Sequence, residues 1–155
     1  TSLGNITAAL FAKECPETVW NFINLAEGRQ ETPAREGKYY DGLLFHRVIK
    51  GQLIYSGCPK GNGYGSPGYR FGNECTAELK HDRAGIMSMV NGGPNQNGSQ
   101  FMITLAPSHY LDGRNTVFGK VIDGINVIYK IGNTPINDNN RPEEPVILNR
   151  VTVNR

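Results

Sequence analysis

Two polar segments of the sequence carry side chains that could do chemistry. The first, Phe45-His46-Arg47-Val48-Ile49, places an imidazole and a guanidinium side by side in a β-prone run. A fixed guanidinium is a permanent cationic donor. By residue type alone, Arg47 fits that role or that of an ordinary surface arginine paired with a carboxylate. We expect His46, on the opposite face of the strand, to be a hydrogen-bonded structural residue.

The second segment, Asn95-Gln96-Asn97-Gly98-Ser99-Gln100-Phe101, gathers carboxamides, which both donate and accept hydrogen bonds. By residue type alone, Gln100 could bind a ligand or merely cap the end of a strand.

Other chemical patterns in the chain lack the context that their chemistry needs. Gly63–Gly68 matches the GxGxxG string, but Pro67 and the residues after it offer no helix to face a phosphate. The three histidines, His46, His81 and His109, lack the spacing of metal ligands, and no GxSxG nucleophile turn is present. We therefore expect neither a nucleotide site nor a metal site.

The cysteines do not form a recognisable framework. Cys15, Cys58 and Cys75 cannot all pair with one another, and no CxxC motif is present. This spacing favours neither a disulfide scaffold nor a zinc site, and it leaves a single Cys58–Cys75 bridge open.

Short β-prone runs must position these side chains. We expect strands at 2–10, 43–49, 53–57, 85–90, 101–105, 116–121 and 146–153. Polar loops should occupy 28–42 and 133–145, and six glycines mark 57–72 as a long surface excursion. About seven strands with two short helices suggest a closed antiparallel barrel.

Two helical patterns accompany the strands. The first begins at Pro16 and ends before Gly28, and its apolar face is formed by Val19, Phe22, Ile23 and Ala26. We expect Trp20, the only tryptophan, to serve packing. The second is expected to have Asp123 as its N-cap and to end at Gly132, with one apolar face formed by Ile125, Ile128 and Ile131.

Length and composition describe one globular domain spanning residues 1–155. With 38% hydrophobic and 19% charged residues the chain is not of the disordered class, and a net charge of +2 gives no reason to expect nucleic acid. No apolar stretch approaches the length of a membrane span. We expect a monomer, because the sequence has no long apolar surface stripe. Thr1 stands almost inside an expected strand, so we expect residues upstream to be missing. A cytoplasmic location is favoured, with a periplasmic or secreted one open if a signal was removed.

Further motifs at ordered spacing surround the two polar segments. Tyr40-Asp41-Gly42 precedes the first, and Leu111-Asp112-Gly113 and Val117-Phe118-Gly119-Lys120-Val121 follow the second. With them the sequence resembles the cyclophilin family of peptidyl-prolyl cis-trans isomerases, from Gly4-Asn5-Ile6 to Val151-Thr152-Val153. The resemblance implies an all-β dominated fold: a closed eight-stranded antiparallel barrel capped by two α-helices. It also implies a shallow outer groove for Xaa-Pro segments of peptides or unfolded proteins, and an isomerisation that needs neither a metal nor an organic cofactor.

The resemblance makes Arg47 the expected catalytic residue. Rotation about the peptide bond faces a barrier of about 18–20 kcal/mol, and because no covalent bond breaks, a catalyst need only bind the twisted amide better than the planar one. On twisting, the prolyl nitrogen regains a lone pair that a guanidinium can stabilise. The expected substrate-binding residues by the same resemblance are Gln52, Leu53, Tyr55, Val90, Asn91, Gly92, Gln100, Met102, Tyr110, Leu111 and Asn115, of which Leu53, Met102 and Leu111 would form the proline pocket.

Several groove positions depart from the family's pattern. Gln52 replaces a phenylalanine against the proline ring, Tyr55 replaces the glutamine that supports the arginine, and Met102 replaces the second phenylalanine. Tyr110 replaces the usual tryptophan or histidine, and Asn115 a frequent histidine. Tyr55 could still orient Arg47 through its hydroxyl or by stacking on the guanidinium.

We expect from these departures a reduced or altered activity and weak sensitivity to cyclosporin. Loss of the aromatic wall at Gln52 removes apolar contact worth about 1–3 kcal/mol. The alternative is a proline-peptide binding or chaperone module with little turnover, which would have no evident need of Arg47.

Overall fold

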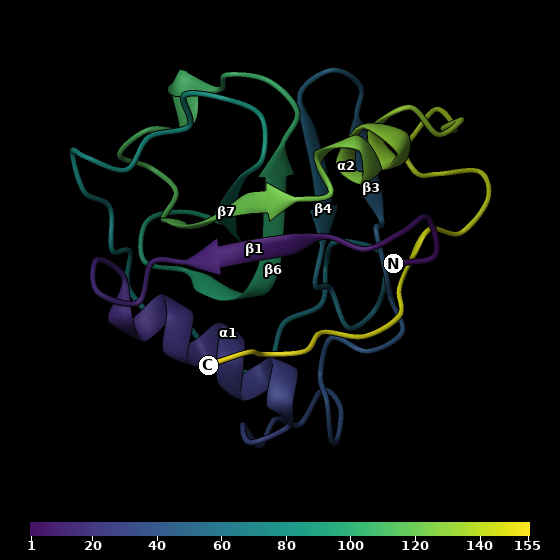
Figure 1. Ribbon diagram of the computed structural model, residues 1–155. Coiled ribbons are helices and arrows are strands. Elements are labelled where there is room, and N and C mark those ends of the chain that lie inside the picture. The colour runs from purple at the N-terminus through teal and green to yellow at the C-terminus, as the bar shows by residue number, and fades with distance from the viewer.

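Eight strands and two α-helices make up the protein in the computed structural model, which describes all residues 1–155 (Figure 1). The strands are β1 (Thr7–Leu10), β2 (Leu43–Leu44), β3 (Arg47–Ile49), β4 (Leu53–Ser56), β5 (Ile86–Asn91), β6 (Asn97–Thr104), β7 (Val117–Asp123) and β8 (Ile147–Leu148). The helices are α1 (Pro16–Glu27), α2 (Ile125–Gly132) and a short 3-10 helix, η1 (His109–Leu111). No helix is both long enough and apolar enough to cross a membrane.

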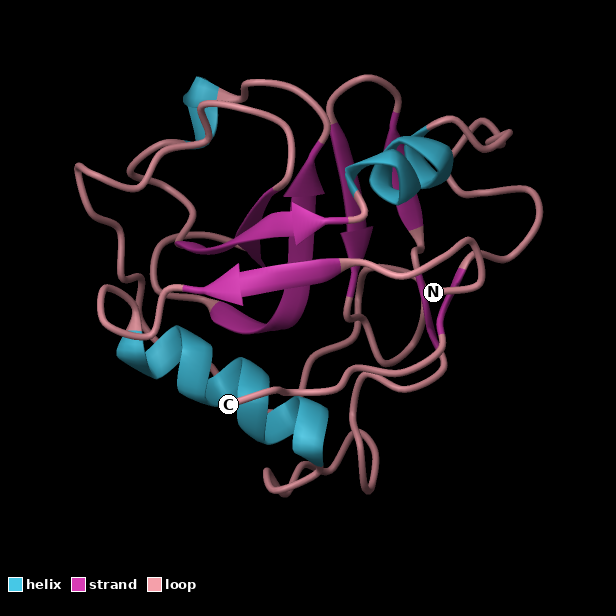
Figure 2. Ribbon diagram, in the orientation of Figure 1, coloured by secondary structure: helices cyan, strands magenta, loops and turns pink.

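The strands pair antiparallel throughout, but they do not close into the expected barrel. Six of them form one sheet in the order β1-β7-β5-β6-β4-β3, and β2 and β8 form a separate pair (Figure 2). The two outer strands of the large sheet, β1 and β3, do not pair with each other. Because β2 and β8 have only two residues each, the contact across this gap is reduced to single backbone bonds such as Ser2 N–H to Ile147 O (2.8 Å).

One face of the large sheet covers the core. Val48, Ile54, Ile103 and Met87 lie opposite one another on adjacent strands and are all buried. Helix α1 packs over this side (Figure 1), and the ring of Phe22 lies 4.8–5.6 Å from those of Tyr40, Phe118 and Phe101. Since side chains alternate along a strand, the residues next to this row point to the opposite face.

Helix α1 confirms the expected boundaries. Pro16 opens it, and Gly28 ends it with a φ of 75°, a left-handed conformation that glycine adopts without strain. Its first turn is capped from a distance: the Thr18 N–H donates to the carboxylate of Glu74 at 2.6 Å. The expectation for Trp20 was wrong, because this side chain is 61% exposed. It lies off the face formed by Val19 and Phe22.

The second helix was predicted with the wrong cap. Asp123 remains in β7, where it pairs with Thr7, and the N-cap is Gly124 with a φ of 89°. A Cβ at Gly124 would lie 2.3 Å from the Asn5 carbonyl oxygen, so the chain can turn from strand to helix here only with glycine. Ile128 and Ile131 face the core as expected, but Ile125 is 41% exposed at the start of the helix.

Several strand boundaries also differ from the expectation. The run 43–49 is divided into β2 and β3 because Phe45 and His46 are both buried, which interrupts the alternation. Strand β6 begins at Asn97, four residues before the predicted start. The buried Asn97 donates from Nδ2 to the Phe71 carbonyl oxygen, and the buried Ser99 hydroxyl donates to that of Gly57. In the C-terminal run only Ile147–Leu148 pairs.

The cysteines are all free, so the Cys58–Cys75 bridge left open above is not formed.

Candidate active site

Arg47 stands at the end of a row of side chains that crosses four strands. The antiparallel register places Arg47 opposite Tyr55, Tyr55 opposite Met102, and Met102 opposite Ser88. Because directly paired residues point to the same face, this row lies on the face of the sheet opposite the Val48 row. Arg47 is exposed, Tyr55 is half-buried, and Met102 and Ser88 are buried.

The guanidinium of Arg47 is held by an aromatic ring and not by a carboxylate. Arg47 Cζ lies 5.4 Å from the centroid of the Tyr55 ring, within the range of a cation–π contact. None of the five ion pairs in the molecule includes Arg47. The reading of Arg47 as a surface arginine paired with a carboxylate is therefore wrong, and its N–H donors remain open to a ligand.

His46 lies beneath this corner of the site and is 7% exposed. Its ring centroid is 6.4 Å from that of Tyr55. Burial, with the positive charges of Arg141 and Arg47, lowers the pKa of His46 to about 4, so that the ring is neutral at neutral pH. We expected a hydrogen-bonded residue. The structure instead leaves the buried Nδ1 of His46 without a hydrogen-bond partner.

Gln100 is tied to the glycine-rich excursion. Its Nε2 donates to the carbonyl oxygens of Gly63 and Gly65, both at 2.9 Å, which leaves Oε1 as the free acceptor of the amide. The N–H groups of the same two glycines donate to Cys58 Sγ at 3.2 Å. Burial raises the pKa of the Cys58 thiol, but the surrounding backbone N–H groups outweigh it and leave this pKa below its ordinary value. The loop is thus folded around Cys58 and fixes Gln100.

The turn after η1 forms the opposite wall, and two amides connect it to β5. Asn91 Nδ2 donates to the Arg114 carbonyl oxygen at 3.2 Å, and Asn115 Nδ2 donates to the Met89 carbonyl oxygen at 3.0 Å. Tyr110 in η1 is 59% exposed and Leu111 is half-buried.

The remaining expected residues take different positions in this frame. Gln52 and Gly92 are exposed, Val90 is half-buried beside an irregularity in the β5–β6 pairing, and Leu53 is buried at 1% exposure. Gln52 lies in the turn between β3 and β4, where its carbonyl oxygen accepts the Leu105 N–H at 2.7 Å. Of the expected pocket residues, Leu53 and Met102 present almost no surface, so Leu111 offers most of the accessible apolar contact.

Two hollows of the surface lie elsewhere. One of about 90 Å³ lies beside Leu44 and Arg141, and one of about 290 Å³ lies between Trp20 and Tyr69. Neither includes an expected site residue. No group of three or more histidine, cysteine or acidic side chains could hold a metal ion.

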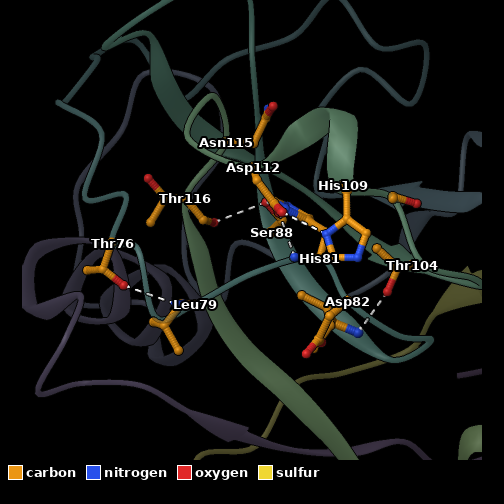
Figure 3. Close-up of polar contacts among 12 residues, drawn as sticks. Thr76, Leu79, His81, Asp82, Ser88, Thr104, His109, Asp112, Asn115 and Thr116 are labelled. Atoms are coloured by element: carbon orange, nitrogen blue, oxygen red, sulfur yellow. Dashed lines mark hydrogen bonds and ion pairs between the residues drawn. The ribbon is translucent and has the colours of Figure 1, made fainter.

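Sequence reasoning missed a polar network behind the site. His81 Nδ1 lies 2.8 Å from Asp112 Oδ1, and its Nε2 lies 2.8 Å from Ser88 Oγ (Figure 3). Residues 31 positions apart meet here, so no local spacing could have revealed the contact. The only signal was the position of Asp112 directly after Tyr110 and Leu111.

Comparison with protein families and curated proteins gives a consistent result. Residues 1–153 match the family model described as cyclophilin type peptidyl-prolyl cis-trans isomerase. A peptidyl-prolyl cis-trans isomerase A of Mycobacterium tuberculosis is 41% identical over 161 residues, covering 99% of this chain and 88% of its own length. A peptidyl-prolyl cis-trans isomerase of Arabidopsis thaliana is 43% identical over 156 residues, covering 99% of this chain and 90% of its own.

Solved structures agree with the sequence relatives. A crystal structure of a Cryptosporidium parvum cyclophilin type peptidyl-prolyl cis-trans isomerase has a TM-score of 0.87 and 36% identity, covering 96% of this chain and 90% of that one. A second structure of that protein, in the presence of the dipeptide Ala-Pro, has a TM-score of 0.90 and 34% identity and covers 99% and 94% of the two chains.

Proposed function

The chain belongs to the cyclophilin family of peptidyl-prolyl cis-trans isomerases and is an enzyme of that class, and we propose that it isomerises Xaa-Pro bonds through Arg47. The substrates are proline-containing peptides or flexible segments of unfolded chains. The Cryptosporidium structure obtained with Ala-Pro supports this substrate class. The observation that carries the proposal is an exposed arginine with no carboxylate partner, whose guanidinium lies over the ring of Tyr55.

The role of Arg47 follows from its free donors. As the Xaa-Pro amide twists, its nitrogen regains a lone pair, and a guanidinium N–H directed at that lone pair stabilises only the twisted state. Stacking on Tyr55 limits the freedom of the guanidinium without using its N–H groups. One charge-assisted hydrogen bond of this kind contributes about 1.5–3 kcal/mol, or one to two decades in rate.

The same groove should bind its substrate weakly. Gln52 is an exposed amide where an aromatic wall would cover the proline ring, and Leu53 and Met102 are buried too deeply to replace it. We propose reduced or altered activity for this reason. Because Tyr110 offers a smaller ring than tryptophan, we also propose weak binding of cyclosporin.

The test is NMR exchange between the cis and trans forms of a short Xaa-Pro peptide. Wild type is compared with Arg47→Ala, with Tyr55→Phe, which keeps the ring, and with Arg150→Ala, an exposed arginine without a partner, as the matched control. We expect Arg47→Ala to lose about 10- to 100-fold in kcat. Arg150→Ala and Tyr55→Phe should keep most of the activity.

The alternative is a recognition module with little turnover, and the same spectra distinguish it. If wild type leaves the exchange rate unchanged while the peptide signals still shift on binding, the groove binds proline peptides without catalysing their isomerisation. If wild type catalyses exchange and Arg47→Ala does so equally well, the assignment of Arg47 is wrong.

A further inference from the structure

His81 is a buried histidine that no part of the proposed mechanism uses. It lies in the segment between the glycine-rich excursion and β5, and none of its surface is exposed. Its ring and main chain are fully bonded: the ring nitrogens contact Asp112 and Ser88, the backbone N–H donates to Asp112 Oδ1 at 2.7 Å, and the backbone carbonyl oxygen accepts the Ser108 N–H at 2.8 Å.

Asp112 connects His81 to the wall of the groove. It is the C-cap of η1 and therefore follows Tyr110 and Leu111 directly. Its Oδ1 receives the two donors of His81, and its Oδ2 lies 2.9 Å from His109 Nδ1 (Figure 3). Burial alone would raise the pKa of Asp112, but these N–H donors outweigh it and hold that pKa well below the usual range. The carboxylate is therefore charged, and its hydrogen bonds are of the strong, charge-assisted kind.

The other ring nitrogen reaches the floor of the groove. Ser88 Oγ, 2.8 Å from His81 Nε2, belongs to the row in which Met102 and Tyr55 lead to Arg47. The Ser88 hydroxyl also lies 3.2 Å from the Thr116 carbonyl oxygen, at the far end of the same wall turn. His81 thus bonds at once to the turn that carries Leu111 and to the strand that carries the floor.

The sequence of contacts Ser88–His81–Asp112 has the geometry of a hydrolase triad, but it cannot act as one. Ser88 is 0% exposed, so no acyl group can reach its hydroxyl. With Asp112 charged, the neutral ring donates from Nδ1 to the carboxylate and accepts the Ser88 hydroxyl at Nε2. The single hydroxyl hydrogen of Ser88 is then directed at Nε2, and the Thr116 carbonyl oxygen accepts the Met89 N–H at 3.0 Å. Both ring nitrogens are thus satisfied, as a structural clamp requires.

We propose that His81 is a positioning residue for isomerisation: through Asp112 it holds Tyr110 and Leu111 at a fixed distance from the floor row that ends at Arg47. The inference rests on the isomerase function proposed above. Leu111 supplies most of the apolar surface for the proline ring, so a displaced turn weakens substrate binding, whereas Arg47, supported by Tyr55, keeps its place.

Variants at the two ring nitrogens test the clamp. His81→Leu removes both bonds, whereas the amide of His81→Asn can replace Nδ1 as the donor to Asp112. In the peptide exchange assay, at a temperature where each variant is folded, we expect His81→Leu to raise KM about tenfold with kcat changed less than about threefold. His81→Asn should recover most of the lost affinity. His109→Ala, which removes only the exposed donor to Asp112, should raise KM less than His81→Leu does.

The controls separate this inference from the function on which it rests. Arg47→Ala in the same assay must lower kcat; if it does not, the proposed function fails first. Two outcomes, each with Arg47→Ala lowering kcat, would refute the clamp and leave the proposed function standing. Either folded His81→Leu keeps the wild-type KM, or His81→Asn is as impaired as His81→Leu. Should His81→Leu not fold, Asp112→Asn decides: the clamp requires a higher KM, and an unchanged KM would refute it.

Discussion

At the scale of the residue, the site depends on which polar groups are left without a protein partner. Arg47 forms no ion pair with a carboxylate. Gln100 donates from Nε2 to two glycine carbonyl oxygens, and its Oε1 has no protein partner. Under the proposed function, a bound peptide would meet one free cation and one free acceptor, held in place by contacts on their other sides. Such preorganisation lets binding energy act on the twisted amide and avoids spending it on ordering the site.

His46 makes the stability of this corner sensitive to acid. Burial lowers its pKa from 6.5 to about 4, so above pH 6.5 the ring is neutral in both folded and unfolded chains. As the pH falls from 6.5 toward 4, the unfolded chain binds the proton first, and we expect the free energy of unfolding to drop by up to roughly 3 kcal/mol. Urea denaturation of wild type and His46→Gln at several pH values measures this.

The two proteins must be compared by the slope of the free energy of unfolding against pH, because other groups also destabilise the folded chain as the pH falls. Asp112 has a lowered pKa and also loses its contribution in acid, and His81, whose pKa burial lowers, does so too. His46→Gln should have a distinctly shallower dependence of stability on pH between 6.5 and 4. If the free energy of unfolding falls equally with pH in the two proteins, the pKa of His46 is not lowered by burial.

Much of the candidate site could be predicted from residue types and their order, but its supports could not. The position of Arg47 follows from a motif a few residues long, and antiparallel register places it on one face with Tyr55 and Met102. The stacking of Tyr55 on Arg47 was one of two open alternatives, and only the structure decides between them. The link from Asp112 to His81 joins distant segments, and a sequence carries no local sign of such a contact.

At the scale of the element, helix α1 depends on a carboxylate from another part of the chain. Its N-cap, Cys15, makes no side-chain cap, and Glu74 instead accepts the N–H groups of Glu17 and Thr18 at 3.2 and 2.6 Å. A negative charge at a helix N-terminus also interacts favourably with the helix dipole. We expect Glu74→Gln to lower the free energy of unfolding by about 1–2 kcal/mol, measured by urea denaturation.

The matched control for this prediction is Glu78→Gln. Glu78 is exposed, lies four residues along the same segment and has no hydrogen bond or ion pair. Its substitution should change stability by less than about 0.5 kcal/mol. Equal effects of the two substitutions would show that the loss comes from net charge and not from the cap.

Elements were predictable where local chemistry decides them. Helix α1 has Pro16 and Gly28 at its ends, and both boundaries followed from these residues. Helix α2 has no such signal, since Gly124 serves as cap by permitting a close approach to Asn5. The predicted strand β6 was too short at its N-terminal end. Asn97 and Ser99 are buried polar residues whose partners lie on distant loops, and a search for alternating apolar residues does not detect them.

At the scale of the whole molecule, the antiparallel order places the Arg47 row and the core on opposite sides of one sheet. The Arg47 row and the Val48 row cross the same strands, β3, β4, β6 and β5, one residue apart. Packing on the core side therefore determines the spacing of the groove. The open edge between β1 and β3 could not be foreseen from strand count, because closure depends on how long β2 and β8 remain paired.

The C-terminal tail, 149–155, leaves β8 and runs toward α1 on the core side (Figure 1). The Val151 N–H donates to Asp41 Oδ1 at 3.1 Å, Val151 and Val153 pack against the core, and Arg155 pairs with Glu27 at 2.9 Å. No hydrogen bond of Arg47, Gln100, Asn91 or Asn115 reaches this tail. The tail should thus serve stability and not the groove.

Removal of residues 150–155 should separate these two properties. We expect the free energy of unfolding to fall by about 1–3 kcal/mol, because two partly buried valines lose their contacts, while kcat/KM for an Xaa-Pro peptide stays within about twofold of wild type. Arg155→Ala alone should be nearly neutral, since its ion pair is exposed to solvent. If the truncated protein is folded but has a much lower kcat/KM, then packing of the tail on the core side also affects the groove, and the separation of the two properties is wrong.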